Sequence, residues 1–412
     1  MKTRLSGIVV FLLITFNLSF GQTTRHYLVI LRSNTGSITL WDGNVTDIFG
    51  FASTLGTEPT LPGKTLYAEE GDTVIINAWS VSQGDHHTIH LHGLDVDTRN
   101  DGDPMTSFAL QHMSDTTYTF IAHNAGTYIY HCHVGDVVHV QMGMYGLIVV
   151  KAAGGANTAW TGGPSYNKDY KWLMTELDKS WHDNIPVHDT SNHTIQLPPY
   201  QPDYFLINGK SQQQLNHDSI AIKGAVGESI YLRLANIGFF DNRVILPASL
   251  NAVVIDSDGR PLPSSVQTDT IYISPGERYG VMLNPSVEFT GTVAVEYINM
   301  NTGSVWQTEL PPVTISGFTG INEHGEDDSQ ASVYPNPASN FLEIEMKNKK
   351  ISLVEYTMIN ALGEVVLKEV TELSASFSNK KRIDVSQFNA GVYYLQINTS
   401  TEQYNKKIVL VK

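Results

Sequence analysis

The chain has 412 residues, of which 41% are hydrophobic and 16% are charged, and its formal net charge at pH 7 is −15. A nucleic-acid-binding protein needs a basic face, so the acidic balance argues against a nucleic-acid partner. A chain of this length exceeds what a single hydrophobic core normally organises, and we expect roughly two or three domains.

The first 21 residues have the pattern of a secretory signal peptide. Lys2 and Arg4 form a basic start, residues 8–14 form an apolar core, and residues 19–21 offer a cleavage site. The apolar stretch is too short to span a membrane, and no later segment approaches the length of a transmembrane segment. We therefore expect an exported protein from which residues 1–21 are removed.

Beyond the signal peptide the composition predicts an all-β chain. The sequence contains 19 Tyr and 33 Gly, and short alternating runs, such as 73–79 and 128–130, are separated by Gly, Asn, Asp and Pro. This pattern is typical of β-sandwiches and barrels, and we find no long amphipathic helix. The predicted domains are 22–152, 168–316 and 332–412, separated by polar, glycine-containing linkers at 153–167 and 317–331.

The first domain contains the one cysteine of the chain and two groups of closely spaced histidines. Cys132 lies in the run His131-Cys132-His133, and upstream comes the run His87-Thr-Ile-His90-Leu-His92-Gly93. A single cysteine cannot form an internal disulfide, and an unpaired thiol in an oxidising compartment is a liability that a metal bond removes. A thiolate flanked by imidazoles suits copper, whereas structural zinc sites prefer several thiolates.

Side-chain alternation in β-strands separates these residues into two sets. His90 and His92 point to one face of a strand, His131 and His133 do the same on another, and Cys132 must then point to the opposite face. The two histidine pairs can hold one set of metals while the cysteine anchors another. A blue copper site needs two imidazoles, a thiolate and a weak axial thioether. The candidate residues for such a site are His87, Cys132, His139 and Met144.

These motifs resemble the copper domain of the multicopper oxidase family, which has a cupredoxin fold. The blue-copper domain of that family carries His-x-x-His-x-His-Gly, then His-Cys-His, then a histidine, and an axial Met or Leu five residues later. By this resemblance the type 1 copper would be held by His87, Cys132, His139 and Met144. The type 2 copper would be held by His90, and the type 3 pair by His92, His131 and His133.

Two further features bear on the resemblance. His139 follows Cys132 by seven residues where ordinary laccases have five, and the longer loop resembles small two-domain laccases and copper nitrite reductases. The kept interval of five between histidine and methionine favours Met144 over Met142. Residues 100–104 resemble the acidic Asp-Gly-x-Pro segment of the family, so Asp101 is the candidate proton donor to reduced oxygen; a surface turn is the alternative.

The second domain resembles the copper-free middle cupredoxin of three-domain oxidases, in the runs 204–210, 254–259 and 275–279. We expect it to space or assemble the protein without redox work. The trinuclear cluster of the family takes four His-x-His pairs, and this chain supplies two. Three hypotheses follow: a homo-oligomer in which two first domains face each other, a nitrite-reductase-like single copper at a subunit interface, or an electron-transfer cupredoxin with vestigial pairs.

The resemblance implies a secreted oxidoreductase that depends on copper. Electrons from a phenolic, aromatic amine or low-valent metal donor would enter singly through an exposed His139, or through His87. They would pass along Cys132 to the histidine pairs, where dioxygen is reduced to water. The alternatives are a copper nitrite reductase-like enzyme and a non-enzymatic electron shuttle or copper carrier.

Residues 332–412 predict a small Ig-like β-sandwich with Pro335 and Pro337 at its start and tight turns at Gly363 and Gly391. The run also resembles the C-terminal sorting domain of the type IX secretion system. That resemblance implies recognition by the type IX machinery, passage through the periplasm, and release or attachment at the cell surface. An Ig-like adhesion module is the alternative.

Overall fold

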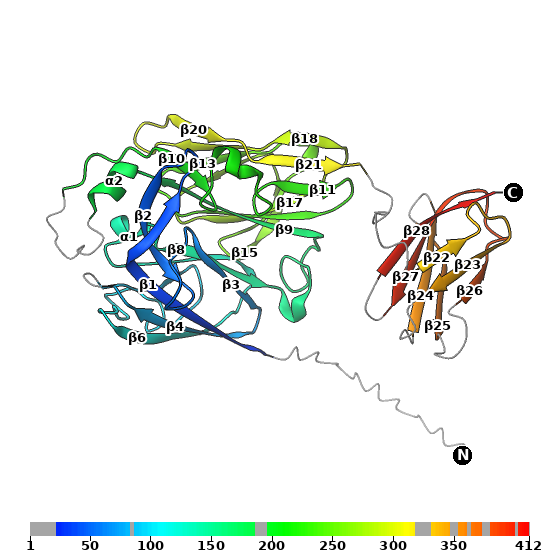
Figure 1. Ribbon diagram of the computed structural model, residues 1–412, viewed down its shortest axis with the longest axis horizontal. Helices are drawn as coiled ribbons and strands as arrows, with labels where there is room; N and C mark the ends of the chain where they lie inside the picture. The colour runs from blue at the N-terminus through cyan, green and yellow to red at the C-terminus, as the bar shows by residue number, and fades with distance from the viewer. Residues whose placement is uncertain are drawn as a thin grey trace, which may run out of the picture. The chain divides into compact units, whose positions relative to one another are not determined.

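The computed structural model describes residues 22–82, 86–185, 196–317, 331–346, 353–360, 364–372, 380–399 and 403–411. The chain forms two compact units, Met1–Gly317 and Phe318–Lys412 (Figure 1). The predicted signal peptide and most of the second predicted linker lie outside the described residues.

The first unit begins with a sandwich of two four-stranded sheets. One sheet has the order β2-β1-β4-β6, with β2 (Val45–Ala52), β1 (Thr24–Thr39), β4 (Thr73–Ser80) and β6 (Ser114–Ile121). The other has the order β3-β8-β7-β5, with β3 (Gly63–Glu69), β8 (Tyr145–Lys151), β7 (Gly126–His131) and β5 (His90–His92). Apolar side chains of both sheets meet in one buried cluster that includes Phe49, Ile76, Tyr118 and Ile148.

Strand β7 is buried on both faces, because its sheet lies between two cores. Neighbouring side chains of a strand point to opposite sides. Tyr130 packs in the core of the first sandwich, whereas Ile129 packs with Leu173 of the second sandwich. Cys132 is on the core face with Tyr130. By the same alternation, His131 lies on the face turned to the second sandwich.

A short helix, α1 (Asp136–Gln141), follows β7 and carries His139. Its N-cap is Gly135, whose φ of 56° lies in the left-handed region that glycine adopts at low cost. Directly after the helix, the Met144 N–H donates to the His139 carbonyl at 2.9 Å and the chain enters β8. The helix therefore accommodates the long interval between Cys132 and His139.

The second sandwich has a six-stranded sheet of order β10-β9-β12-β17-β14-β15, packed against smaller sheets of order β11-β21-β18 and β16-β13-β19-β20. The strands of the large sheet are β10 (Tyr204–Ile207), β9 (Lys168–Leu177), β12 (Ile230–Asn236), β17 (Arg278–Leu283), β14 (Val253–Ser257) and β15 (Arg260–Gln267). The others are β11 (Ile222–Ala225), β21 (Pro312–Ser316), β18 (Phe289–Thr292), β16 (Thr270–Ile273), β13 (Asp241–Ile245), β19 (Ala294–Ile298) and β20 (Val305–Glu309).

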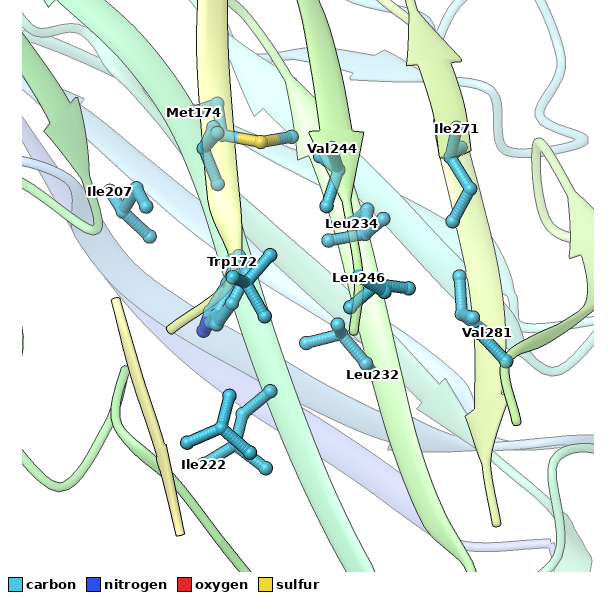
Figure 2. Packing of buried hydrophobic residues seen from close by; sticks show 14 of the residues in the cluster. Trp172, Met174, Ile207, Ile222, Leu232, Leu234, Val244, Leu246, Ile271 and Val281 are labelled. Atoms are coloured by element: carbon cyan, nitrogen blue, oxygen red, sulfur yellow. The ribbon is translucent and has the colours of Figure 1, made fainter. Parts of the chain in front are cut away.

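The core of the second sandwich is built around Trp172. Figure 2 shows Trp172 and Met174 of β9 beside Leu232 and Leu234 of β12, all within one buried apolar cluster. The indole Nε1 of Trp172 donates to the carbonyl of Ile220 at 3.0 Å, so the polar atom of this large side chain is satisfied. This core holds β12 and β17 in place, and the turn before β17 reaches the first sandwich.

Helix α2 (Lys179–Asn184) ties the second sandwich to the first. The Asp178 side chain caps it by accepting the Trp181 N–H at 3.2 Å, which satisfies one of the open donors of the first turn. His182 Nδ1 then donates to the carbonyl of Asp47 in β2 at 2.6 Å. The described residues also include short 3-10 helices at Ala153–Gly155, Gln212–Asn216 and Ala248–Leu250.

The segment 153–167, expected as a linker, is held against both sandwiches. The Gly155 N–H donates to a carboxylate oxygen of Glu69 at 3.0 Å. Ala159 and Tyr166 are buried in a cluster with Tyr231 of the second sandwich. The two sandwiches are thus joined by a packed connection, in keeping with their place in one compact unit.

The second unit is a separate small sandwich with its own core. Its sheets have the orders β22-β23-β26 and β25-β24-β27-β28. The strands are β22 (Ala331–Tyr334), β23 (Phe341–Met346), β26 (Lys380–Asp384), β25 (Val365–Glu372), β24 (Leu353–Asn360), β27 (Gly391–Thr399) and β28 (Gln403–Leu410). Ile344, Tyr356 and Leu395 are fully buried between the two sheets.

The predicted all-β class, with sandwich domains, is confirmed. Within the described ranges the α-helices are the six-residue α1 and α2, in agreement with the absence of a long amphipathic pattern. In the part of the chain that the structure describes, no helix is long and apolar enough to cross a membrane.

Candidate metal centres

Strands β5 and β7 bring the predicted histidine pairs together at one edge of the sheet. They pair antiparallel, with His90 opposite His131 and His92 opposite Ile129. Because cross-strand neighbours share a face, the three histidines project to the same side. Cys132 follows His131 and projects to the other side, into the core of the first sandwich. The sheet therefore separates two groups of candidate ligands.

The core group consists of His87, Cys132 and His139, and all three side chains are 0% exposed. Cys132 Sγ lies 3.2 Å from His139 Nδ1 and 3.9 Å from His87 Nδ1. The Thr88 N–H faces the same sulfur at 3.5 Å, which favours the thiolate form. Two imidazole nitrogens and one sulfur converge in a dry core, and this donor set is the one that copper prefers.

Burial keeps the imidazole of His87 neutral. Desolvation lowers the pKa of His87 well below its usual value, and repulsion from His139 and His86 adds to this effect. Neutral imidazole is the form that binds a metal. The expectation that His139 is exposed is wrong, because its ring is fully buried. Its Nε2 edge lies under exposed Gly135, where an added Cβ would be 3.6 Å from Nε2.

Both methionines that compete for the axial position are fully buried. Met142 and Met144 are 0% exposed and belong to the same apolar cluster as Cys132. The Cys132 N–H donates to the Met144 carbonyl at 3.0 Å, so these two backbones lie side by side. This proximity is in favour of Met144, and its axial role stays a prediction.

The edge group consists of His90, His92 and His131, whose candidate ligand atoms lie within 4.8 Å of one another. His92 Nδ1 is 3.4 Å from His131 Nε2. The His133 ring is centred 4.9 Å from that of His90 and 5.8 Å from that of His131, so the fourth predicted histidine lies beside the same group. His131 is buried, whereas the other three are partly exposed.

Main-chain carbonyls orient two rings of the edge group. His90 Nδ1–H donates to the carbonyl of Asp101 at 2.8 Å, and His131 Nδ1–H donates to that of Cys132 at 2.9 Å. In a neutral imidazole, each bond leaves Nε2 with a lone pair. Such outer contacts commonly fix the tautomer and the direction of a metal-binding histidine.

Burial also sets the charge state of His92 and His131 in the edge group. Desolvation lowers the pKa of His131 to about 3, and the neighbouring imidazoles add to the effect. Desolvation and the nearby guanidinium of Arg278 lower the pKa of His92 to about 4. Both rings are therefore neutral at physiological pH, which is the state that metal binding requires.

Asp101 lies at the rim of the edge group. Its carboxylate Oδ1 is 3.5 Å from His90 Nδ1, and its side chain is 31% exposed. Its backbone carbonyl also accepts the Leu91 N–H at 3.1 Å, so the acidic turn is tied to β5. The carboxylate thus lies between solvent and the edge group, and its role as a proton donor stays a prediction.

The motifs did not single out Thr88 as a functional residue. Its N–H faces Cys132 Sγ, and its Oγ1 accepts the His133 N–H at 2.9 Å. It is 0% exposed and contacts both Cys132 of the core group and His133 beside the edge group. Its place inside the His87-x-x-His90 spacing was the available signal.

Arg278 also lies beside the edge group, next to His92 and Gly93. It belongs to the run 275–279 of the second sandwich, which was expected to take no part in copper binding.

The two groups are joined through one stretch of backbone. Cys132 of the core group is covalently bonded to His131 and His133 on either side, so the path between the groups is short. Within the described ranges, these are the two places where three or more His, Cys, Asp or Glu side chains converge as metal ligands do.

Comparison with known proteins places these groups in a family context. Residues 43–154 and 160–292 match two family models that are both described as multicopper oxidase, and residues 332–412 match the secretion system C-terminal sorting domain. The first two matches together cover more than half of the chain. The chain is similar to Laccase-2 of Oryza sativa subsp. japonica, with 26% identity over 236 residues, covering 54% of this chain and 39% of that protein.

Solved structures support the same fold. The blue copper oxidase from Nitrosomonas europaea has a TM-score of 0.56 and 26% identity, covering 71% of this chain and 86% of that one. The copper nitrite reductase from Nitrosomonas europaea has a TM-score of 0.54 and 17% identity, covering 71% and 94%, and shows likeness of fold alone. The chain spans less than two thirds of the length of the first curated relatives that it matches. The chain belongs to the multicopper oxidase family and ends in a secretion system C-terminal sorting domain.

Proposed function

We propose that this protein is a secreted, laccase-like oxidoreductase. It takes single electrons from phenolic, aromatic or metal-ion donors and uses them to reduce dioxygen to water. The observation that carries this proposal is the convergence of His87, Cys132 and His139 in the core, joined by the backbone of Cys132 to the histidines at the sheet edge. Copper bound at these groups supplies the one-electron redox chemistry and the binding of dioxygen.

The donor chemistry of each group fits a different copper type. A thiolate with two imidazoles and a thioether suits a type 1 site, which assigns His87, Cys132, His139 and the axial Met144. Imidazoles alone suit the type 2 and type 3 coppers. We assign His90 to the type 2 copper, and His92, His131 and His133 to the type 3 pair.

The residues around each group have separate tasks. The closed core excludes water from the Cys132 sulfur, and the Thr88 N–H stabilises its negative charge. Donors transfer electrons at the surface around Gly135, which lies over the His139 ring. At the edge group, Asp101 lies between solvent and His90 and passes protons to reduced oxygen.

A complete type 2 and type 3 set requires a second copy of the chain. One copy supplies four histidines, and three of them, His90, His92 and His133, are partly exposed at the sheet edge. We propose a homo-oligomer in which first sandwiches related by two-fold symmetry pool their pairs. Because the second sandwich of the same chain lies beside His92, the partner copy approaches over His90 and His133.

Two other functions are consistent with an edge group to which one chain contributes two of the four His-x-His pairs. A single copper at a subunit interface would make the protein a nitrite reductase-like enzyme, and the chain shares its fold with a copper nitrite reductase. An edge group without copper would leave an electron shuttle. Both alternatives keep the core copper and differ from the oxidase in the copper content of the edge group.

The sorting domain supports a proposal for the route of export. We propose that residues 1–21 direct the chain to the periplasm and that the type IX machinery recognises residues 332–412. The mature protein is then released from the cell or attached to its surface. Mass spectrometry of the extracellular protein tests this route: a C-terminus near residue 330 is expected, and a mature protein that keeps the last unit argues for an adhesion module.

The copper content of the purified oligomer, measured with its dioxygen consumption, tests the oxidase proposal. The full protein should bind blue, type 2 and type 3 copper and should consume dioxygen with a phenolic donor. Cys132→Ser should abolish the blue band, whereas His90→Ala should keep it and abolish dioxygen consumption. His217→Ala, at an exposed histidine of the second sandwich, is the matched control and should change neither.

Two results separate the alternatives, and a third tests the separation of the two groups of ligands. One copper per chain with a blue band and no dioxygen consumption would identify a shuttle. Reduction of nitrite by the blue protein, with copper at a single edge site, would identify the nitrite reductase-like enzyme. Loss of the blue band in His90→Ala would contradict the separation of the two groups by the sheet.

A further inference from the structure

The second sandwich contributes a turn to the edge group, although no metal ligand was expected there. The turn precedes β17 and spans residues 274–277. The Gly276 N–H donates to the carbonyl of Asn236 at 2.8 Å, and the Asn236 N–H donates to that of Glu277 at 3.1 Å. These bonds fix the turn to the end of β12. It lies on the side of the β5–β7 sheet to which His92 and His131 project.

Gly276 of this turn lies directly against the imidazole of His92. A Cβ on Gly276 would lie 3.2 Å from His92 Cε1 and 3.4 Å from His92 Nε2. The φ of Gly276 is +88°, a conformation that residues with side chains rarely adopt. The Nε2 edge of the ring therefore faces backbone, while its Nδ1 is 3.4 Å from His131 Nε2. The turn and the edge group enclose His92 from two sides.

Arg278 locks this turn onto the strand that carries His131. Its Nε–H donates to the carbonyl of Thr127 in β7 at 3.3 Å, and its Nη1–H donates to the carbonyl of Gly276 at 2.6 Å. The same Nη1 pairs with Asp258 at 2.9 Å. The guanidinium lies over Gly93, where a Cβ would overlap Nη2. One buried side chain thus connects the turn, β7 and the residue that follows His92.

We propose that the second sandwich is a structural part of the edge metal site, and that Arg278 is its positioning residue. Arg278 holds Gly276 against the Nε2 edge of His92, so that the ring presents Nδ1 to the metal. His90 and His131 present Nε2 instead, because carbonyls take their Nδ1–H groups. This inference rests on the proposed binding of copper by the edge histidines. By this inference the second sandwich supplies no expected copper ligand, but it orients a ligand of the first sandwich.

The test compares copper loading and spectra of the full-length oligomer in two variants with matched controls. In Arg278→Gln the guanidinium group that bonds to the carbonyls of Thr127 and Gly276 is lost. Its control is Arg233→Gln, because Arg233 is also a buried arginine of the second sandwich, 0% exposed, whose Nη1 is 3.3 Å from Thr127 Oγ1. In Gly276→Ala a Cβ is added against His92. Its control is Gly303→Ala, with φ of +67° and open space around the added atom.

We expect Arg278→Gln and Gly276→Ala to keep the blue band and to lose edge copper. The affinity for edge copper should fall about 10- to 100-fold, as is typical when a residue that orients a metal ligand is removed. The near-ultraviolet absorption band of the type 3 pair, to which His92 is assigned, should weaken, and Arg278→Lys should partly restore it. Both control variants should load copper like the natural chain.

Two outcomes would overturn the inference, and a third would overturn the proposed oxidase function on which it rests. Full edge copper with an unchanged type 3 absorption band in both variants would refute the positioning role. Equal loss of edge copper in Arg233→Gln and Gly303→Ala would show a general effect of disturbing the second sandwich. If the natural chain itself binds blue copper alone, the proposed oxidase function fails first, and the inference fails with it.

Discussion

Glu176 is a buried carboxyl group that we expect to make the protein less stable at neutral pH than at acidic pH. It lies on β9 and is 3% exposed. Its Oε1 accepts the Tyr200 O–H at 3.1 Å and the Phe239 N–H, whereas Oε2 has no hydrogen-bond partner among the described residues. Desolvation is the main cause that raises the pKa of Glu176 to about 7.

The sign and size of the effect follow from the pKa in the two states. Below pH 4.5 the carboxyl group is protonated both in the folded and in the unfolded chain, and it costs nothing. Between pH 4.5 and 7 the unfolded chain ionises while the folded chain keeps its proton, so the free energy of unfolding falls. Above pH 7 the loss is constant. One pKa unit is worth about 1.36 kcal/mol, so the rise from 4.5 to about 7 costs about 3 kcal/mol.

Replacement by an uncharged residue of the same shape removes this cost. The free energy of unfolding of the copper-free protein is measured by urea denaturation for Glu176→Gln and for the natural chain. The gain of Glu176→Gln over the natural chain should be about 3 kcal/mol larger at pH 8 than at pH 4. The exposed Glu58 supplies the control Glu58→Gln, which should show no such pH-dependent difference. A difference between Glu176→Gln and the natural chain that is equal at both pH values would refute the reasoning.

Two further predictions concern the metal centres. Thr88→Val keeps the shape of the side chain but leaves the His133 N–H without its acceptor, and should lower the free energy of unfolding by about 1–3 kcal/mol. The control Thr88→Ser keeps the hydroxyl and should retain most of that stability. Equal losses in both variants would argue against a stabilising contribution from this hydrogen bond. Met144→Leu should raise the reduction potential and shift the blue band, whereas Met142→Leu should leave both unchanged. The reverse pattern would assign the axial position to Met142.

Several features of the fold and site were predictable because they depend on short stretches of sequence. Alternation along a strand predicts that Cys132 and its flanking histidines point to opposite faces, and the structure agrees, with Cys132 in the core of the first sandwich and Ile129 in the neighbouring cluster. The spacing of His90 and His92 predicts one shared face. Apolar and aromatic runs between turn residues predict sandwiches. In each case the physical rule acts between residues close in sequence, so the pattern is visible in the chain itself.

Other features required the packing of distant segments. An exposed His139 was expected from the resemblance, but α1 turns the ring into the core below Gly135. Thr88 contacts Cys132 and His133 because folding places these residues, 44 and 45 positions later in the chain, beside it. Nothing near Arg278 in the sequence indicates that its side chain reaches Gly93, since the two are brought together by the contact between sandwiches.

The sequence by itself determined the chemistry of this protein: a thiolate, imidazoles and a thioether in strand-like spacing predict copper, since ligand type and periodicity are local properties. The tertiary structure alone decided the environment of those ligands. It placed one group in a dry core and the other at a partly exposed edge, and it set a turn of the second sandwich against His92. Burial and orientation depend on contacts between segments far apart in the chain, and those contacts exist only when the chain is folded.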